Sequence, residues 1–140
     1  MVRQSQDQER NGREDGRQQF PFEGLHVYQR AQEAWLASLA TTDDPLGAEI
    51  EREIHQATIG IARATAHSRA NGSRSDGFSS ALEEARASLH AAAALIEQRT
   101  RRGEAEEPEL RTLLMDGSRM LGALIRTVSQ RGEVEAEAVV

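Results

Sequence analysis

The stretch FSSALEEARASLHAAAALI, residues 78–96, decides the fold class of this 140-residue chain. Its apolar residues recur at alternating steps of four and three, at Phe78, Leu82, Ala85, Leu89, Ala92 and Ile96. Such steps keep the side chains on one face of an α-helix, whereas a strand would alternate at every second residue. The stretch therefore predicts a helix that packs along one seam against other helices.

Three further segments have the same period and predict helices over about 23–40, 45–67 and 108–130. In the first of these segments the expected core-facing row is Leu25, Tyr28, Gln32, Trp35 and Leu39. In the second it is Leu46, Ile50, Ile54, Ala57, Ile61 and Ala64. In the third it is Leu110, Leu113, Gly117, Met120, Leu124 and Val128, and Leu114, Leu121 and Ile125 widen it. No segment has the pattern of a strand. Four amphipathic helices with short links predict an all-α, up-down-up-down four-helix bundle.

Capping and turn-forming residues lie between the predicted helices. Asp43 and Asp44 precede Pro45, which predicts an N-cap followed by proline in the first turn. Ser75 or Asp76 is expected to cap the third helix. Gly103 and Pro108 separate the last two helices, and Gly132 is expected to end the fourth.

The charge pattern divides the chain into three parts. Residues 1–21 form a polar N-terminal tail that cannot bury enough apolar surface to order in isolation. Residues 22–130 form the predicted four-helix bundle, and residues 131–140 form an acidic C-terminal tail. No internal repeat is evident.

Composition excludes several classes of protein. Hydrophobic residues make up 38% of the chain and aromatic residues 4%, so the core must be aliphatic and rich in alanine. The absence of cysteine excludes disulfides, thiol catalysis and cysteine-ligated zinc. No apolar run approaches the roughly 20 residues that span a bilayer, and the polar N-terminus lacks the apolar region of a secretory signal. We therefore expect a soluble, cytoplasmic protein.

The 17 basic residues are all arginine, yet the net charge is -6, which argues against indiscriminate nucleic-acid binding. No acid occurs between residues 54 and 75, and an up-down bundle brings this region near the end of the fourth helix and near Arg30. The expected RNA- or anion-binding residues are Arg63, Arg69, Arg74, Arg126 and Arg131. An alternative is that these arginines only complement helix C-terminal carbonyls. The opposite pole collects acids, partly offset by Arg99, Arg101 and Arg102.

A second set of small or apolar residues lies away from the predicted core rows. These residues are Ile59, Ala62, Ala66, Ala87, Ala91 and Ala94. Small residues on an outer helix face permit close approach by another helix, which predicts self-association. The alternative is that alanine is present only as the best helix former.

Two blocks carry a family resemblance. The pattern F-x-x-L-x-V-Y-x-x-A occurs at 22–31, and F-x-x-A-L-x-x-A-x-A-S-L at 78–89. With the order of the helices, they resemble the bacterial four-helix-bundle proteins encoded in intervening sequences of ribosomal RNA genes, a family that includes the accessory variability proteins of diversity-generating retroelements. The resemblance implies a homopentameric barrel whose retroelement members bind RNA and a reverse transcriptase through basic surface. The chain departs from the family pattern over 61–66 and at Ala91.

Metal and catalytic motifs are weak. Glu23 and His26 have the spacing of half a di-iron motif, which needs a second copy and two further glutamates. Glu51 and His55 are one turn apart, yet the core rows contain no acid. Ser88 lacks a nucleophile elbow, and no phosphate-binding glycine loop or dinucleotide fingerprint occurs. We expect no metal, no cofactor and no enzymatic activity.

The expected function is that of a self-assembling accessory protein that binds RNA or an RNA-associated protein such as a reverse transcriptase. The alternative is a protein–protein adaptor with no nucleic-acid role, whose tails dock a partner protein.

Overall fold

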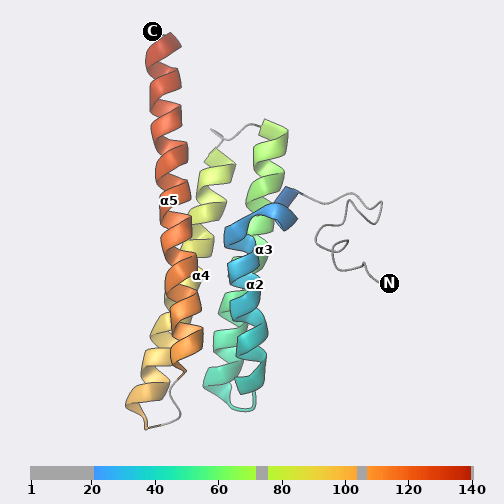
Figure 1. The fold of residues 1–140 in the computed structure, drawn as a ribbon, viewed down its shortest axis with the longest axis vertical. Helices are drawn as coiled ribbons and strands as arrows, with labels where there is room; N and C mark the ends of the chain where they lie inside the picture. Colours follow the sequence, from blue (N-terminus) through green and yellow to red (C-terminus); the bar gives the residue numbers. More distant parts are fainter. Residues whose placement is uncertain (1–20, 72–75, 104–106, 140) are drawn as a thin grey trace, which may run out of the picture.

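Four long helices run along a common axis, each antiparallel to the next (Figure 1). They are α2 (His26–Ser38), α3 (Pro45–Asn71), α4 (Asp76–Arg101) and α5 (Pro108–Val139), with 3-10 turns η3 (Pro21–Gly24) and η4 (Leu39–Thr41) at the two ends of α2. The structure, a computed structural model, describes residues 21–71, 76–103 and 107–139, with side chains over 22–40, 42–67, 77–103 and 107–129. The expected polar N-terminal tail lies almost wholly outside the described residues.

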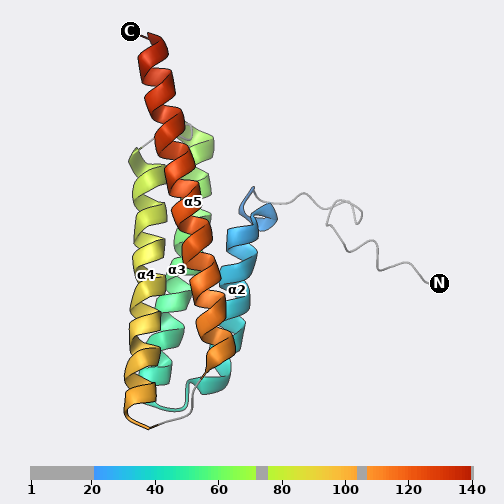
Figure 2. The same cartoon turned by 60° about the vertical axis from the view of Figure 1, so that its left-hand side comes forward.

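The helices pack in a ring of neighbours, which confirms the up-down-up-down bundle. Helix α3 packs on α2 and α4, and α5 packs on α4 and α2 (Figure 2). Over the described ranges, neither diagonal pair brings Cα atoms within 8 Å of each other, so α3 and α5 occupy opposite corners. The closest pair is α3 and α4, where Gly60 lets the backbone of α3 approach Ala85.

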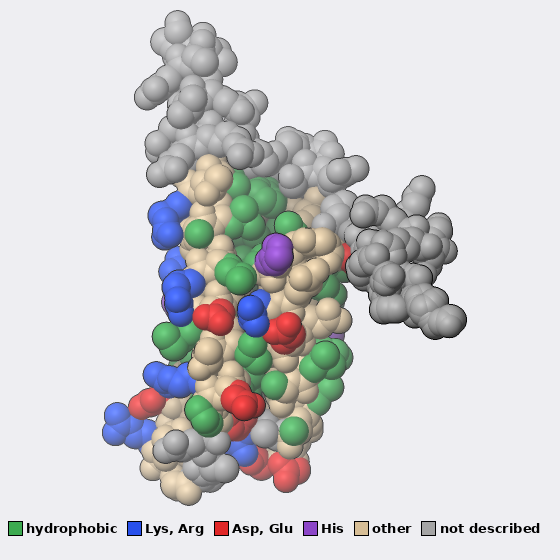
Figure 3. Space-filling model, viewed as in Figure 1, with side chains coloured by type: hydrophobic (Ala, Val, Ile, Leu, Met, Phe, Trp, Pro, Cys, Tyr) green, Lys and Arg blue, Asp and Glu red, His purple; other side chains and the backbone are tan. Residues whose placement is uncertain are grey.

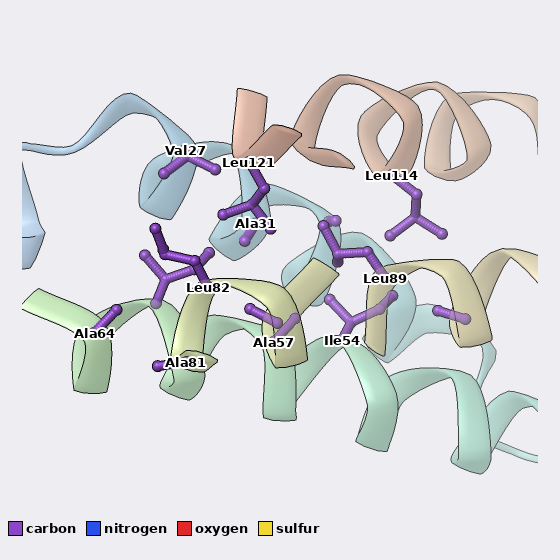
Figure 4. Packing of buried hydrophobic residues seen from close by; sticks show 14 of the residues in the cluster. Val27, Ala31, Ile54, Ala57, Ala64, Ala81, Leu82, Leu89, Leu114 and Leu121 are labelled. Atoms are coloured by element: carbon purple, nitrogen blue, oxygen red, sulfur yellow. The ribbon is translucent and has the colours of Figure 1, made fainter. Parts of the chain in front are cut away.

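The core is aliphatic, as the composition predicts. All six residues of the 78–96 seam are buried, and they meet Ile50, Ile54, Ala57, Ile61 and Ala64 of α3. Figure 4 shows Val27 and Ala31 of α2 and Leu114 and Leu121 of α5 pointing between the other two helices. The predicted seam of α4 is confirmed, and so is that of α3 except for Leu46, which is half-buried. On α5 the predicted residues Leu113, Met120 and Leu124 are half-buried, and Leu114 and Leu121 are buried instead.

The predicted core row of α2 is wrong by a rotation of the helix. The buried residues are Val27, Ala31, Ala34 and Ser38, whereas Gln32 is exposed. Large residues such as Trp35 lie half-buried at the edges, and Leu39 is 44% exposed. Small side chains on the central row let α2 lie close to the core, which the larger residues then flank. The helix also begins later than predicted, at His26, after the 3-10 turn.

The turn chemistry at the acidic end agrees with the sequence. The Asp44 carboxylate accepts a hydrogen bond from the Gly47 amide at 2.6 Å, which makes Asp44 the N-cap of α3 with Pro45 next to it. Gly103 follows α4 with a φ of 84°, a conformation that favours glycine, and its amide donates to the Thr100 carbonyl at 3.0 Å. Helix α4 begins at Asp76, and Ser75 lies outside the described residues.

The predicted end of the fourth helix is wrong. Helix α5 continues through Gly132 to Val139 and projects past the ends of α3 and α4 (Figures 1 and 2). One glycine inside a helix costs only about 1 kcal/mol relative to alanine. The following run, EVEAEAV, consists largely of good helix formers with no proline. The acidic C-terminal segment 131–139 is therefore helical.

Across the described ranges, none of the helices combines the length and the apolarity that crossing a bilayer would need.

Candidate interaction surfaces

The predicted anion-binding arginines do not form one described cluster. Arg63 on α3 and Arg126 on α5 are both exposed, but their helices occupy opposite corners of the bundle. The side chains of Arg69 and Arg131, and all of Arg74, lie outside the described part of the structure. The end of α3, the start of α4 and the upper half of α5 do share one pole (Figure 1). These helix ends thus share one end of the bundle, although Arg63 and Arg126 lie on helices at opposite corners.

Arg30 does not join that pole, contrary to the prediction. Its guanidinium donates to Glu33 at 2.8 Å, one turn along α2. It also lines a hollow of about 480 Å³ together with Glu109 and Asp116 near the start of α5. Its charge is thus met by acids.

At the acidic pole, arginines form ion pairs with several of the carboxylates. The Arg99 guanidinium bonds Asp44 at 3.0 Å and Glu107 at 2.8 Å. Nearby, Arg101 donates to Glu97 at 2.8 Å. This hydrogen bond and the positive charge of Arg101 lower the pKa of Glu97, and the same hydrogen bond and the negative charge of Glu97 raise the pKa of Arg101.

The expected self-association residues lie where the sequence places them, away from the core. Ile59 is 42% exposed, and Ala66, Ala87 and Ala94 are exposed. Ala62 and Ala91 are half-buried. Ile59 and Ala87 each lie about opposite the buried row of their own helix, at 100° per residue.

Two exposed leucines that sequence reasoning missed extend this surface onto α2. Leu36 is 55% exposed, and Leu39 is 44% exposed, instead of packing in the core as predicted. With Trp35 and Ile59, they define what we term the α2/α3 apolar face. Figure 3 shows hydrophobic side chains at the surface on the side of α2. Leu36 is exposed because α2 turns the row of Ala31 toward the core, and choosing this row from the sequence would have predicted the exposure of Leu36.

Trp35 connects the two halves of this face. Its indole N–H donates to Glu51 at 2.6 Å, and its ring lies 5.5 Å from the His55 ring, centroid to centroid. Glu51 and His55 therefore act as packing partners of a tryptophan. Within the described residues, no three metal-ligating side chains gather at one point.

A third feature lies on the outer seam between α4 and α5. His90 and Ser118 are hydrogen-bonded across it at 2.7 Å. One turn further along, Arg86 reaches from α4 over Gly122 of α5, beside Arg126. In the view of Figure 3, basic side chains follow the edge of the molecule on the side of α4 and α5. Sequence reasoning missed Arg86, because only the antiparallel pairing of the helices places it opposite a glycine.

No known protein family, no curated protein and no solved structure matches this chain. Function is therefore inferred from the chain's own surfaces and charges.

Proposed function

We propose that this protein is a non-enzymatic, self-assembling, cytoplasmic accessory protein that binds RNA or an RNA-associated protein such as a reverse transcriptase. Copies associate through the α2/α3 apolar face. The observation that carries the proposal is the exposure of three aliphatic side chains on one side of the bundle, with Leu36 at 55%, Leu39 at 44% and Ile59 at 42%.

The three residues lie on elements that pack against one another, α2 and η4 on one side and α3 on the other. Leu36 and Leu39 are one turn apart on the end of α2 and η4, Trp35 directly precedes Leu36, and the Trp35 ring packs against His55 at a tilt of 48°. Ile59 follows His55 by one turn of α3. Covering side chains that are about half exposed yields on the order of 1 kcal/mol each. Apolar surface of this kind marks an interaction site more often than scattered single residues do.

A second copy is the occupant that the surface fits. Ala62 and Ala66 lie on the same side of α3 as Ile59, and small residues allow another helix to approach closely. The resemblance to the ribosomal RNA intervening-sequence proteins implies five copies in a ring. A ring would repeat each arginine of the basic pole around one rim.

The RNA role rests on arginines at that pole. Arg63 and Arg126 are exposed, and within the described residues neither lies within ion-pair distance of a carboxylate. A planar guanidinium suits phosphate oxygens well. The rival is a protein–protein adaptor without a nucleic-acid role, in which the segments 1–21 and 131–140 dock the partner.

Self-association is tested by light scattering after size-exclusion chromatography over a range of protein concentrations. We expect a mass several times that of one chain, and a fall toward one chain for Ile59→Arg and Leu36→Arg. Met115→Arg is the matched control, because Met115 is 53% exposed on α5, away from this face. A wild-type protein that stays monomeric at all concentrations would overturn the proposal.

RNA binding is tested by filter binding across a salt series, since phosphate contacts weaken steeply as salt rises. The variant Arg63→Glu/Arg126→Glu is expected to lose affinity at least tenfold and to flatten the salt dependence. Its control, Arg52→Glu/Arg111→Glu, changes the same charge on the same two helices near the other pole. No RNA binding at low salt would favour the adaptor.

A further inference from the structure

Arg86 carries a buried polar atom that the fold does not satisfy. Its Nε–H is inaccessible to solvent and has no hydrogen-bond partner among the residues that the structure describes. A buried donor without a partner destabilises the folded state, so each such group in a native structure calls for an explanation. Within the described part of the chain, the other atom of this kind is Nε of Arg30, whose guanidinium is paired with Glu33. No carboxylate among the described residues pairs with Arg86.

A second guanidinium lies beside the first. A Cβ atom placed on Gly122 would lie 3.4 Å from Cζ and Nη2 of Arg86 and 3.6 Å from Nη1 of Arg126. Both positive groups therefore converge over the same glycine of α5, where the missing side chain leaves them room. Two like charges brought together repel, and an anion between them removes that cost.

The surroundings of this pair supply further donors and little negative charge. The hollow beside Arg86, of about 320 Å³, is lined by Glu83, Ala87, His90 and Ile125. His90 is held across the seam by its 2.7 Å hydrogen bond to Ser118. Arg86 is the one arginine of this lining and Glu83 its one acid, and Arg126 adds a second positive charge beside Gly122. Ala87 and Ile125 form the apolar part of this lining.

We propose that the α4/α5 seam holds a binding site for a phosphate-type oxyanion, with Arg86 and Arg126 as its ligands and His90 and Ser118 at its edge. Nε–H and an Nη–H of Arg86 form the two-pronged donor that matches two oxygens of a phosphate, and Arg126 binds a third oxygen. The oxyanion separates the two positive charges, and because the Nε–H is inaccessible to solvent in this structure, an oxygen reaches it when the Arg86 side chain shifts outward. The site lies away from the α2/α3 apolar face and does not depend on self-association.

The test is a titration of the full-length ¹⁵N-labelled protein with inorganic phosphate at constant ionic strength, observed by NMR at the arginine Nε–H groups. We expect a saturable shift of the Arg86 Nε–H resonance, with millimolar affinity. Phenyl phosphate and dimethyl phosphate are then compared, since the first represents a terminal phosphate and the second a nucleic-acid backbone. Tighter binding of either identifies the source of the phosphate.

Arg86→Gln is expected to weaken phosphate binding at least tenfold, and Arg126→Gln three- to tenfold. Arg111→Gln is the matched control, because this exposed arginine of α5 already faces Glu97 at 4.0 Å; it should leave the affinity unchanged. Circular dichroism confirms that each variant is folded, and Arg126→Gln, at an exposed position, keeps the test valid if Arg86→Gln unfolds. Equal, non-saturating shifts at Arg86 and Arg111, or unchanged affinity in Arg126→Gln, would overturn the site. Neither result bears on Ile59 or on assembly.

Discussion

The Arg99 guanidinium lies 3.0 Å from the carboxylate of Asp44, a residue 55 positions earlier in the chain. The Arg99 side chain is 9% exposed and also bonds Glu107 at 2.8 Å. It therefore ties the end of α4 to the start of α3 and to the residue that precedes α5. One cation thus joins both loops at the acidic pole.

Arg99→Ala should lower the free energy of unfolding by about 2 kcal/mol, because hydrogen bonds to charged groups contribute more than neutral ones and two carboxylates lose their partner. Urea denaturation measures the change. Arg119→Ala is the control: Arg119 has a carboxylate partner too, Asp116 at 3.3 Å, but its side chain is 71% exposed. An equal loss in both variants would mean that the buried bridge contributes nothing beyond a surface ion pair.

Asp44 has two separable roles, since one oxygen caps α3 and the other pairs with Arg99. Asp44→Asn retains a capping oxygen and removes the charge, whereas Asp44→Ala removes both. The alanine variant should be less stable than the asparagine variant by about 1 kcal/mol, the usual contribution of an N-cap. Thermal unfolding of the two variants side by side measures this. Equal stabilities would show that the cap contributes little here.

The close approach of α3 and α4 at Gly60 predicts a sharp dependence on side-chain size. Gly60→Ala places a Cβ 3.4 Å from the Ala85 Cβ, an ordinary contact, and improves helix propensity, so no loss of stability is expected. Gly60→Leu should cost about 1–3 kcal/mol by overpacking. Gln56→Leu, at an exposed position of α3, is the control and should be nearly neutral in urea denaturation. Tolerance of leucine at both positions would contradict this packing.

The pKa of Glu97 lies below its ordinary value, first because Arg101 donates a hydrogen bond to it, then because of the charges of Arg101 and Arg111. A lowered folded-state pKa means that the stabilising effect is complete above the unfolded-state pKa and is lost as pH falls through the folded-state pKa. Arg101→Gln should therefore raise the pKa of Glu97, and Arg111→Gln should raise it less. Titration of the Glu97 carboxyl carbon by NMR measures both. A pKa unchanged in Arg101→Gln would refute the assignment.

The helical architecture could be predicted because the steps of three and four in α3 and α4 allow only one buried face. The rows of Ile54 and Leu89 settle those two helices without further information. The α2 segment carries apolar residues on nearly all sides of the helix. The larger side chains lie in the row of Trp35, so that row is predicted to face the core instead of the row of Ala31. Only packing against the other helices decides that the small residues face inward.

The surface could be predicted less well, for a physical reason. Ile59 stands out in the sequence because a large aliphatic residue lies opposite a filled core row. Arg86, by contrast, sits between two alanines and resembles any solvated arginine. Its position depends on which residue of α5 lies across the seam, and that register is a property of the folded pair.

The close packing of Gly60 against Ala85 also bears on the order in which the helices unfold and fold. Helices α3 and α4 are close in sequence and share the closest interface, so we expect them to unfold as one cooperative unit. Their amide protons should be the last to exchange with deuterium, while α2 opens first. Such a hairpin of neighbours in sequence closes quickly during folding, and it gives the remaining helices a surface on which to condense.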